Sequence, residues 1–199
     1  MNLKKMFVIF SLIISFKSFG ETILFLGDSL TEGHEVKPRE SYPSEIKRLF
    51  KKDGKDIDVI NGGVSGSTTA SGLSRLKWYM KKKPDLMVLA LGANDGLRGL
   101  DVTHSKKNLI EIIDYARENE VEVFLAEMQM PPNYGKEYTE KFKRIYKDIH
   151  NEKKVPLIPF LLKDVAGKKK YNLPDGIHPN PKGYKIIAKH IYNYIKDKF

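Results

Sequence analysis

Short apolar runs alternate along the chain with longer segments in which apolar residues recur at helical spacing. The short runs are rich in β-branched or other apolar residues and are bounded by Gly, Pro or Asn, which is typical of buried strands. The run from Thr22 to Leu26 leads directly into a glycine, and the run from Asp85 to Leu91 is apolar after its first residue. The predicted strands cover residues 22–26, 56–61, 85–91, 121–127 and 155–159.

The longer segments predict helices. The segment from Tyr42 to Lys52 places Ile46, Leu49 and Phe50 on one face, and Ser41 is a suitable N-cap residue. Further helices are predicted from residue 68 or 69 to residue 80, around residues 109–116, over about 137–151 and over 183–196. The segment after Ser29 up to Pro38 is predicted to be a loop, and residues 160–174 are predicted to be irregular or partly helical.

Strands that alternate with helices predict an α/β fold, in which a parallel sheet is covered on both faces. Right-handed crossovers place the carboxyl ends of all its strands at one edge. The chain has 199 residues and shows no internal repeat, linker or low-complexity segment, so we expect a single domain over residues 21–199.

Residues 1–20 differ in kind from the rest. Lys4 and Lys5 precede an apolar run from Met6 to Phe16, and the small residues Ser18 and Gly20 lie where a signal peptidase needs them. We therefore expect a secretory signal peptide over 1–20 and a mature chain in the periplasm or, alternatively, outside the cell. An uncleaved membrane anchor is the other interpretation, although the run is too short to span a bilayer comfortably.

Charge and cysteine content narrow the classes of function. The formal charge falls from +10 to +7 when Lys4, Lys5 and Lys17 are removed with the signal. The remaining lysines form short clusters near predicted helix ends or loops, where they suit solvent and the helix dipoles; weak contact with an anionic membrane surface is the alternative. We expect no nucleic-acid partner. Since the chain lacks Cys, disulfides, Cys-ligated zinc and a Cys nucleophile are excluded.

Ser29, in Gly27-Asp28-Ser29-Leu30, follows the first predicted strand, where open α/β sheets bind ligands. By itself this stretch is equally suited to a turn or a helix cap. A nucleophilic Ser needs a base, and His178 follows Asp175 by three residues in a loop, so one tight turn can bring the carboxylate to the ring. His34 and His104 are predicted to lie in solvated loops, and His150 and His190 on helices.

An oxyanion needs hydrogen-bond donors, and two candidates follow other predicted strands. The backbone N–H of Gly66 lies in a glycine-rich turn, and Asn94 offers a side-chain amide. Each could be an ordinary turn residue, but together with Ser29 and His178 they favour acyl transfer at one edge of the sheet. The chain has no Gly-x-Ser-x-Gly, His-Glu-x-x-His, phosphate-binding loop or Gly-x-Gly-x-x-Gly motif.

These four stretches resemble the sequence blocks of the SGNH (GDSL-type) hydrolases, and most of all the bacterial periplasmic thioesterase I, lysophospholipase and arylesterase group. The matching stretches are Gly27-Asp28-Ser29-Leu30, Gly66, Gly92-Ala93-Asn94-Asp95 and Asp175-Gly176-Ile177-His178-Pro179-Asn180. The resemblance implies a three-layer α/β/α flavodoxin-like sandwich with a five-stranded parallel sheet, and no metal or other cofactor. It implies Ser29 as nucleophile, His178 as base, Asp175 as its orienting partner, and Ser29, Gly66 and Asn94 as the oxyanion hole. Ala93 departs from the family pattern, which often has Gly there.

The expected substrates are small-molecule acyl esters, lysophospholipids and acyl thioesters, hydrolysed by a monomer. Apolar residues in the loops beside the site could line an acyl groove or could simply pack those loops. Two alternatives stay open: a carbohydrate or polysaccharide O-acetylesterase with a short, open pocket, and a secreted binding protein without catalysis. The groove candidates are Leu97, Leu100, Met128, Met130, Pro131 and Tyr134.

Overall fold

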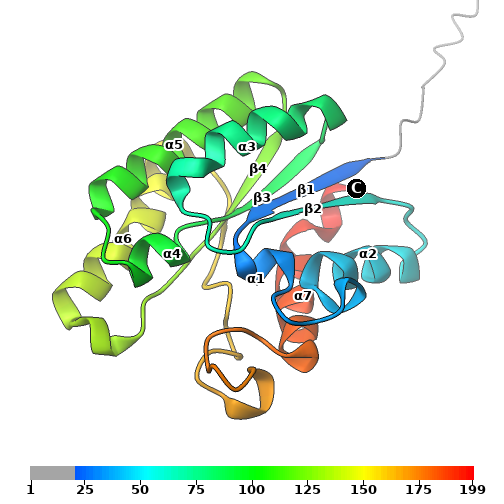
Figure 1. The fold of residues 1–199 in the computed structure, drawn as a ribbon. Helices are drawn as coiled ribbons and strands as arrows, with labels where there is room; N and C mark the ends of the chain where they lie inside the picture. Colours follow the sequence, from blue (N-terminus) through cyan, green and yellow to red (C-terminus); the bar gives the residue numbers. More distant parts are fainter. Residues whose placement is uncertain (1–20) are drawn as a thin grey trace, which may run out of the picture.

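The computed structural model describes residues 21–199 (Figure 1). The predicted signal peptide, residues 1–20, lies outside the described residues. The sheet has five parallel strands in the order β2-β1-β3-β4-β5. The strands are β1 (Thr22–Gly27), β2 (Asp58–Gly63), β3 (Leu86–Ala90), β4 (Glu122–Ala126) and β5 (Leu157–Ile158).

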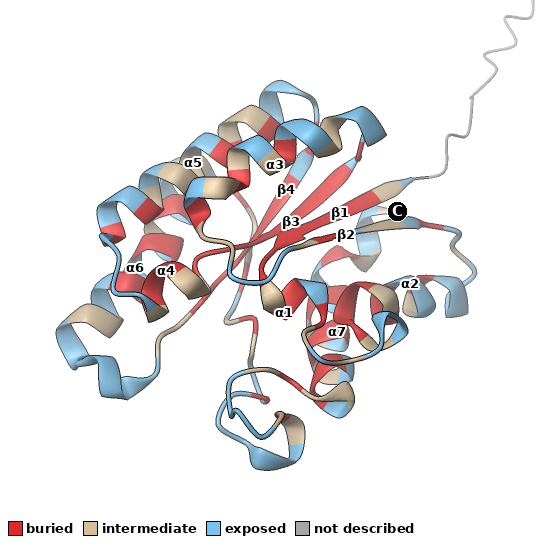
Figure 2. Cartoon of the chain, in the orientation of Figure 1, coloured by how far each residue is buried: buried red, intermediate tan, exposed pale blue. Residues whose placement is uncertain are grey.

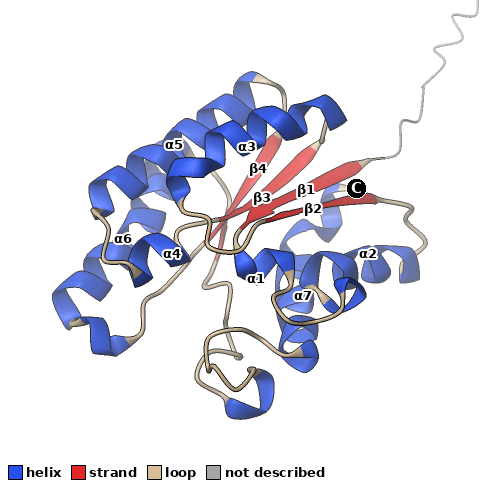
Figure 3. Cartoon of the chain, viewed as in Figure 1, coloured by secondary structure: helices blue, strands red, loops and turns tan. Residues whose placement is uncertain are grey.

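Helices cover both faces of the sheet, so the expected three-layer α/β/α fold is confirmed (Figure 3). The helices α2 and α7 pack together on one face, and α3, α5 and α6 cover the other. The α-helices are α1 (Ser29–Glu32), α2 (Tyr42–Lys52), α3 (Gly72–Tyr79), α4 (Ala93–Leu97), α5 (Val102–Glu118), α6 (Lys136–Lys153) and α7 (Pro181–Ile195). The 3₁₀ turns are η1 (Pro38–Glu40), η2 (Thr69–Ser71), η3 (Met80–Lys82), η4 (Pro132–Tyr134), η5 (Lys169–Tyr171) and η6 (Lys196–Lys198).

The core follows from this layering. All five residues of β3 are buried, because the strand lies in the middle of the sheet and is covered on both faces (Figure 2). The edge strand β2 is mostly exposed or half-buried, since it has a neighbour on one side only. Because helices cover both faces of the sheet, the side chains on both faces of the central strands are buried, which explains the continuous apolar runs in their sequences.

Three predictions of local structure were wrong. The segment after Ser29 starts with the helical turn α1, because the Asp28 carboxylate accepts a hydrogen bond from the Leu30 N–H (3.0 Å) and caps it. The stretch expected to be one helix up to Met80 is divided into η2, α3 and η3. His104, predicted to lie in a loop, lies in the first turn of α5, and Asn94, for which an ordinary turn was the alternative, lies in the short helix α4.

The turns of these short helices are fixed by close contacts. Gly27 ends β1, and a Cβ there would collide with Thr31 and with the Ala90 carbonyl, so only glycine lets α1 fold back against β3. Asp95 in α4 is buried and accepts hydrogen bonds from the Thr69 N–H (2.9 Å), the Thr69 hydroxyl (2.6 Å) and the Ser105 hydroxyl (3.1 Å). Asp95 thereby ties α4 to the segments that precede α3 and begin α5.

Within residues 21–199, no helix is both long enough and apolar enough to cross a membrane.

Candidate active site

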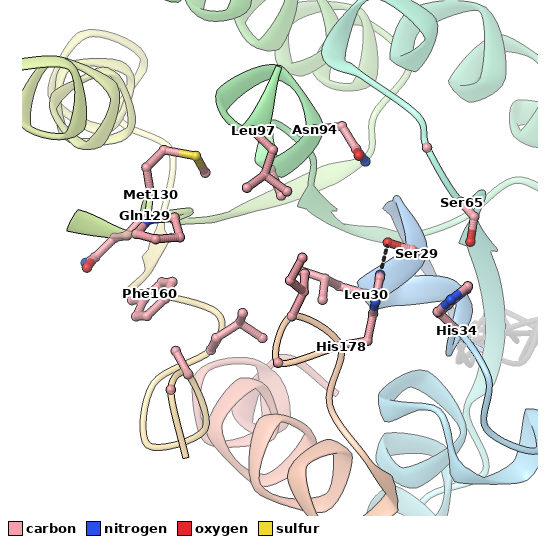
Figure 4. Close-up of a pocket in the computed structure, with 18 of the residues that line it drawn as sticks. Ser29, Leu30, His34, Ser65, Asn94, Leu97, Gln129, Met130, Phe160 and His178 are labelled. Atoms are coloured by element: carbon pink, nitrogen blue, oxygen red, sulfur yellow. Dashed lines mark hydrogen bonds between the residues drawn. The ribbon is translucent and has the colours of Figure 1, made fainter. Parts of the chain in front are cut away.

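Ser29, His178 and Asp175 form one hydrogen-bonded chain at the carboxyl edge of the sheet. Figure 4 shows the bond between Ser29 and His178. Ser29 is the first residue of α1, directly after β1, and its Oγ lies 2.9 Å from His178 Nε2. His178 Nδ1 lies 2.6 Å from Asp175 Oδ2. A carboxylate can only accept, so Nδ1 carries the proton and Nε2 is free to accept one from the serine hydroxyl.

The loop that carries Asp175 and His178 explains their spacing of three. Asp175 Oδ1 accepts the backbone N–H groups of Ile177 (2.9 Å) and His178 (3.0 Å), which closes a tight turn through Gly176 at φ +73°. The other oxygen, Oδ2, is then held beside the His178 ring. Burial raises the pKa of Asp175, but the hydrogen bonds from His178 and Ile177 outweigh it and lower that pKa to about 2. Asp175 is therefore an anion throughout the neutral pH range.

Two donors lie at the same cavity. Asn94 Nδ2 donates one hydrogen bond to the Ser67 carbonyl (3.0 Å), which fixes the amide and leaves its second hydrogen for another acceptor. Gly66 has φ +76°, a left-handed conformation that favours glycine. Among the described residues, none accepts the Gly66 N–H. Both residues line the cavity that Ser29 and His178 also line.

The cavity has a volume of about 750 Å³ and is mainly apolar. Of the predicted groove residues, Leu97, Met130 and Pro131 line it. The predictions for Leu100 and Tyr134 were wrong, because both side chains are exposed outside the cavity, where Tyr134 donates a hydrogen bond to the Leu97 carbonyl (3.2 Å). Met128 is buried in the core. Sequence reasoning missed the lining residues that come from the loop between β5 and α7, which are Phe160, Leu162, Ala166, Gly167, Gly176 and Ile177.

His34 lies in the turn after α1, as predicted, but the expectation that its side chain is solvated was wrong. Its ring is half-buried and lies against the His178 ring, with centroids 4.3 Å apart and the planes tilted by 40°. The one-turn helix α1 ends at Gly33 with φ +92°, which brings the His34 N–H back to the Ser29 carbonyl (3.2 Å). A predicted helical turn after Ser29 would have been the signal for this contact, because the turn and its left-handed end bring the sixth residue, His34, back to the first, Ser29.

The remaining histidines lie away from the cavity. His150 and His190 lie on the helices α6 and α7, as predicted, and bond the backbone carbonyls of Val155 and Pro159, both at 2.7 Å. Among the described residues, the one group of side chains with metal-ligand chemistry is His34, Asp175 and His178. His178 Nδ1 and Asp175 Oδ2 in this group are already bonded to each other at 2.6 Å.

Asp28 lies beneath Ser29 with its side chain fully buried. Burial raises its pKa from 3.8 to about 7, against the opposing effects of the Leu30 N–H and the Arg75 charge. The folded state thus holds a proton that the unfolded chain releases near pH 4. This proton contributes on the order of 4 kcal/mol to the free energy of unfolding. The contribution is fully present below pH 4 and is lost as the pH rises toward 7.

We therefore expect Asp28→Asn to match the parent protein in free energy of unfolding near pH 4.5 and to exceed it near pH 8. Asn presents the same Oδ1 acceptor to the Leu30 N–H but cannot ionise. Urea unfolding from pH 4 to 8 measures the free energy of unfolding against pH for the parent and for Asp28→Asn. Subtracting one profile from the other removes the contributions of all other titrating groups. Parallel profiles over this range would contradict the assignment of a buried, protonated Asp28.

Comparison with known proteins agrees with this site. The sequence model of the GDSL-like lipase/acylhydrolase family matches residues 25–186. An arylesterase of Vibrio mimicus is 36% identical over 185 residues, covering 92% of each chain. Thioesterase 1/protease 1/lysophospholipase L1 of Escherichia coli strain K12 is 32% identical over 182 residues, covering 90% of this chain and 86% of that protein.

A solved structure gives the same result in three dimensions. The crystal structure of TesA has a TM-score of 0.86 and 33% sequence identity, and the match covers 90% of this chain and all of that one. The chain therefore belongs to the GDSL-like lipase/acylhydrolase family, the SGNH hydrolases, and is a carboxylic ester hydrolase.

Proposed function

We propose that the protein hydrolyses esters and thioesters of medium- to long-chain fatty acids, including lysophospholipids, through an acyl-enzyme on Ser29. The observation that carries this proposal is the hydrogen-bonded chain Asp175–His178–Ser29 at the edge of a large, mainly apolar cavity. The chain supplies the nucleophile and its base, and the cavity supplies a surface that suits an alkyl chain.

Acylation follows from the positions of these groups. His178 Nε2 takes the Ser29 proton while Oγ attacks the carbonyl carbon, and the charge that develops on the carbonyl oxygen is met by the Asn94 amide and the Gly66 and Ser29 N–H groups. Asp175 holds the ring in the required tautomer and stabilises the imidazolium. His178 then gives the proton to the departing alcohol or thiol, which leaves the acyl group on Ser29.

Deacylation runs through the same groups in reverse. A water molecule enters where the alcohol has left, and His178 Nε2 removes its proton as it attacks the acyl carbon. The second oxyanion collapses, Ser29 Oγ takes back a proton from His178, and the carboxylic acid departs. One ester and one water thus yield one acid and one alcohol, and the enzyme returns to its starting state.

The shape of the cavity favours long acyl groups over acetyl groups. Ser29 and His178 lie between a polar corner with His34 and Ser65 and an apolar arm with walls that include Leu97 and Met130 (Figure 4). An acetyl group would leave most of the arm in contact with water, whereas each buried methylene contributes about 0.8 kcal/mol. Carbohydrate O-acetyl esters therefore rank second among the candidate substrates.

Hydrolysis of p-nitrophenyl esters with acyl chains from two to sixteen carbons tests this proposal. We expect kcat/KM to rise toward eight or more carbons and to vanish in Ser29→Ala. Activity confined to acetate would instead support the O-acetylesterase alternative. Saturable binding of esters without Ser29-dependent turnover would support the non-catalytic binding protein.

Leu162 offers a test of the acyl arm itself. We expect Leu162→Trp to fill part of the cavity and to lower kcat/KM for a long-chain ester by about 10- to 100-fold relative to acetate, because a few methylenes lose their buried site. The ratio of rates on p-nitrophenyl dodecanoate and acetate measures this. Leu173→Trp, in the same loop but outside this cavity, is the matched control. An unchanged ratio in Leu162→Trp would remove Leu162 from the acyl site.

The proposal also covers the protein's setting. We propose a monomeric mature enzyme over residues 21–199 in the periplasm, which makes weak contact with membrane surfaces. The apolar run of residues 6–16 supports secretion, and the formal charge of +7 that remains on residues 21–199 supports the membrane contact. N-terminal sequencing of the protein from a periplasmic extract tests the cleavage site near Glu21.

A further inference from the structure

Exposed apolar side chains gather around the mouth of the cavity. Among the described residues, six large hydrophobic side chains are exposed, and four of them lie on the loops at the carboxyl edge of the sheet: Val64, Leu100, Tyr134 and Ile177. Val64 precedes Ser65 in the cavity wall, Ile177 lines the cavity, and Tyr134 is bonded to the Leu97 carbonyl. We call these four residues the apolar rim. Such a concentration of exposed apolar groups is typical of a docking surface.

Cations adjoin the apolar rim on one side. The loop between β5 and α7, gold to orange in Figure 1, carries four exposed lysines: Lys163, Lys168, Lys169 and Lys170. Its two carboxylates are already engaged, since Asp164 lies 3.7 Å from Lys168 and Asp175 holds His178. Lys163, Lys169 and Lys170, here called the rim lysines, therefore keep a net positive charge beside the mouth.

The acidic residues near the other side of the mouth keep their charge but do not pair with the rim lysines. Asp101 accepts the N–H groups of Thr103 and His104 and caps α5. Glu137 lies in the first turn of α6, next to Lys136. Glu32 is bonded to the Ser65 N–H and hydroxyl at the polar corner. Among the described residues, none of the rim lysines has an ion-pair partner, and the Lys170 ammonium lies 4.8 Å from the centre of the Tyr171 ring.

We propose that the apolar rim and the rim lysines dock the protein on an anionic phospholipid bilayer with the mouth of the cavity facing the lipid. Apolar side chains would enter the headgroup region while the lysines meet the phosphates. This inference deepens the proposed function, because it would bring an acyl chain to Ser29 directly from the membrane. Docking itself requires no turnover, so its test is independent of esterase activity.

Binding to vesicles tests the charge of the surface. We expect the purified Ser29→Ala variant, which leaves the lipid intact, to co-sediment with phosphatidylcholine vesicles that contain phosphatidylglycerol, more weakly at higher salt, and to bind poorly to phosphatidylcholine alone. Replacing the three rim lysines by Gln should weaken binding by about 100-fold, since each lysine near an anionic surface is worth about fivefold.

A matched control separates this surface from the net charge of the protein. Lys51, Lys52 and Lys81 are exposed at the opposite edge of the sheet, at the ends of α2 and α3. The triple Lys→Gln variant at these positions removes the same charge and should bind nearly as well as the parent. Equal loss of binding in the two triple variants would overturn the proposal, and so would the absence of binding to vesicles with phosphatidylglycerol.

A fluorescence experiment tests the orientation. Trp78 is the single tryptophan of the chain, is 59% exposed, and lies at the end of α3 near the amino edge of the sheet. We expect brominated lipids to leave its emission unchanged and to quench that of the Trp78→Phe/Tyr134→Trp variant. Quenching of Trp78 with no quenching at position 134 would mean that the protein binds lipid by its opposite edge.

Discussion

Replacing Ser29 with Ala is expected to lower kcat/KM for p-nitrophenyl octanoate by about 10⁴- to 10⁶-fold. The variant has no Oγ to attack the carbonyl, so the acyl-enzyme route is closed and only binding and oxyanion stabilisation remain. Among the described residues, the missing atom has His178 as its one hydrogen-bond partner, so the fold should be retained. Steady-state hydrolysis, together with circular dichroism of the variant, measures both effects.

Covalent labelling gives a second readout of the same residue. An alkyl phosphonate ester should add its phosphonyl group to the parent protein with loss of one leaving group, and mass spectrometry should locate the adduct on the peptide that contains Ser29. Ser74→Ala, on the exposed face of α3, is the matched control and should react like the parent. Residual activity of Ser29→Ala within tenfold of the parent would refute the assignment of the nucleophile.

Replacing Asn94 with Ala is expected to lower kcat by about 10²- to 10³-fold with little change in KM, because an oxyanion donor acts mainly in the transition state. The structure shows how the amide is held, since one Nδ2 hydrogen is bonded to the Ser67 carbonyl and orients the other. The p-nitrophenyl octanoate assay with full Michaelis–Menten analysis separates the two constants.

Asn119→Ala is the control for this prediction. Asn119 also donates its side-chain amide to a backbone carbonyl, that of Tyr115 at 2.8 Å, but it lies at the end of α5 away from the cavity. The Asn119→Ala variant should have the same kcat and KM as the parent protein. If Asn94→Ala raised KM and left kcat unchanged, Asn94 would be a substrate-binding residue, and the oxyanion would depend on the backbone N–H groups alone.

The sequence by itself determined the parts of the site that depend on short segments. The alternation of apolar runs and helical segments predicted the parallel sheet, because the burial of strands and helices leaves a local pattern at each element. The three-residue spacing of Asp175 and His178 predicted their contact, because an Asp turn closes within one loop. Ser29, Gly66 and Asn94 were found because each follows a strand, and parallel strands end at one edge.

Only the tertiary structure decided which side chains surround these groups. His34 reaches His178, and Phe160 and Leu162 line the cavity together with Leu97, although they are far apart along the chain. Leu100 and Tyr134 are apolar and lie close in sequence to residues that line the cavity, yet their side chains face solvent. The direction of a loop side chain is set by contacts with distant segments, such as the bonds of Asp95 to Thr69 and Ser105, and no short stretch of sequence records them.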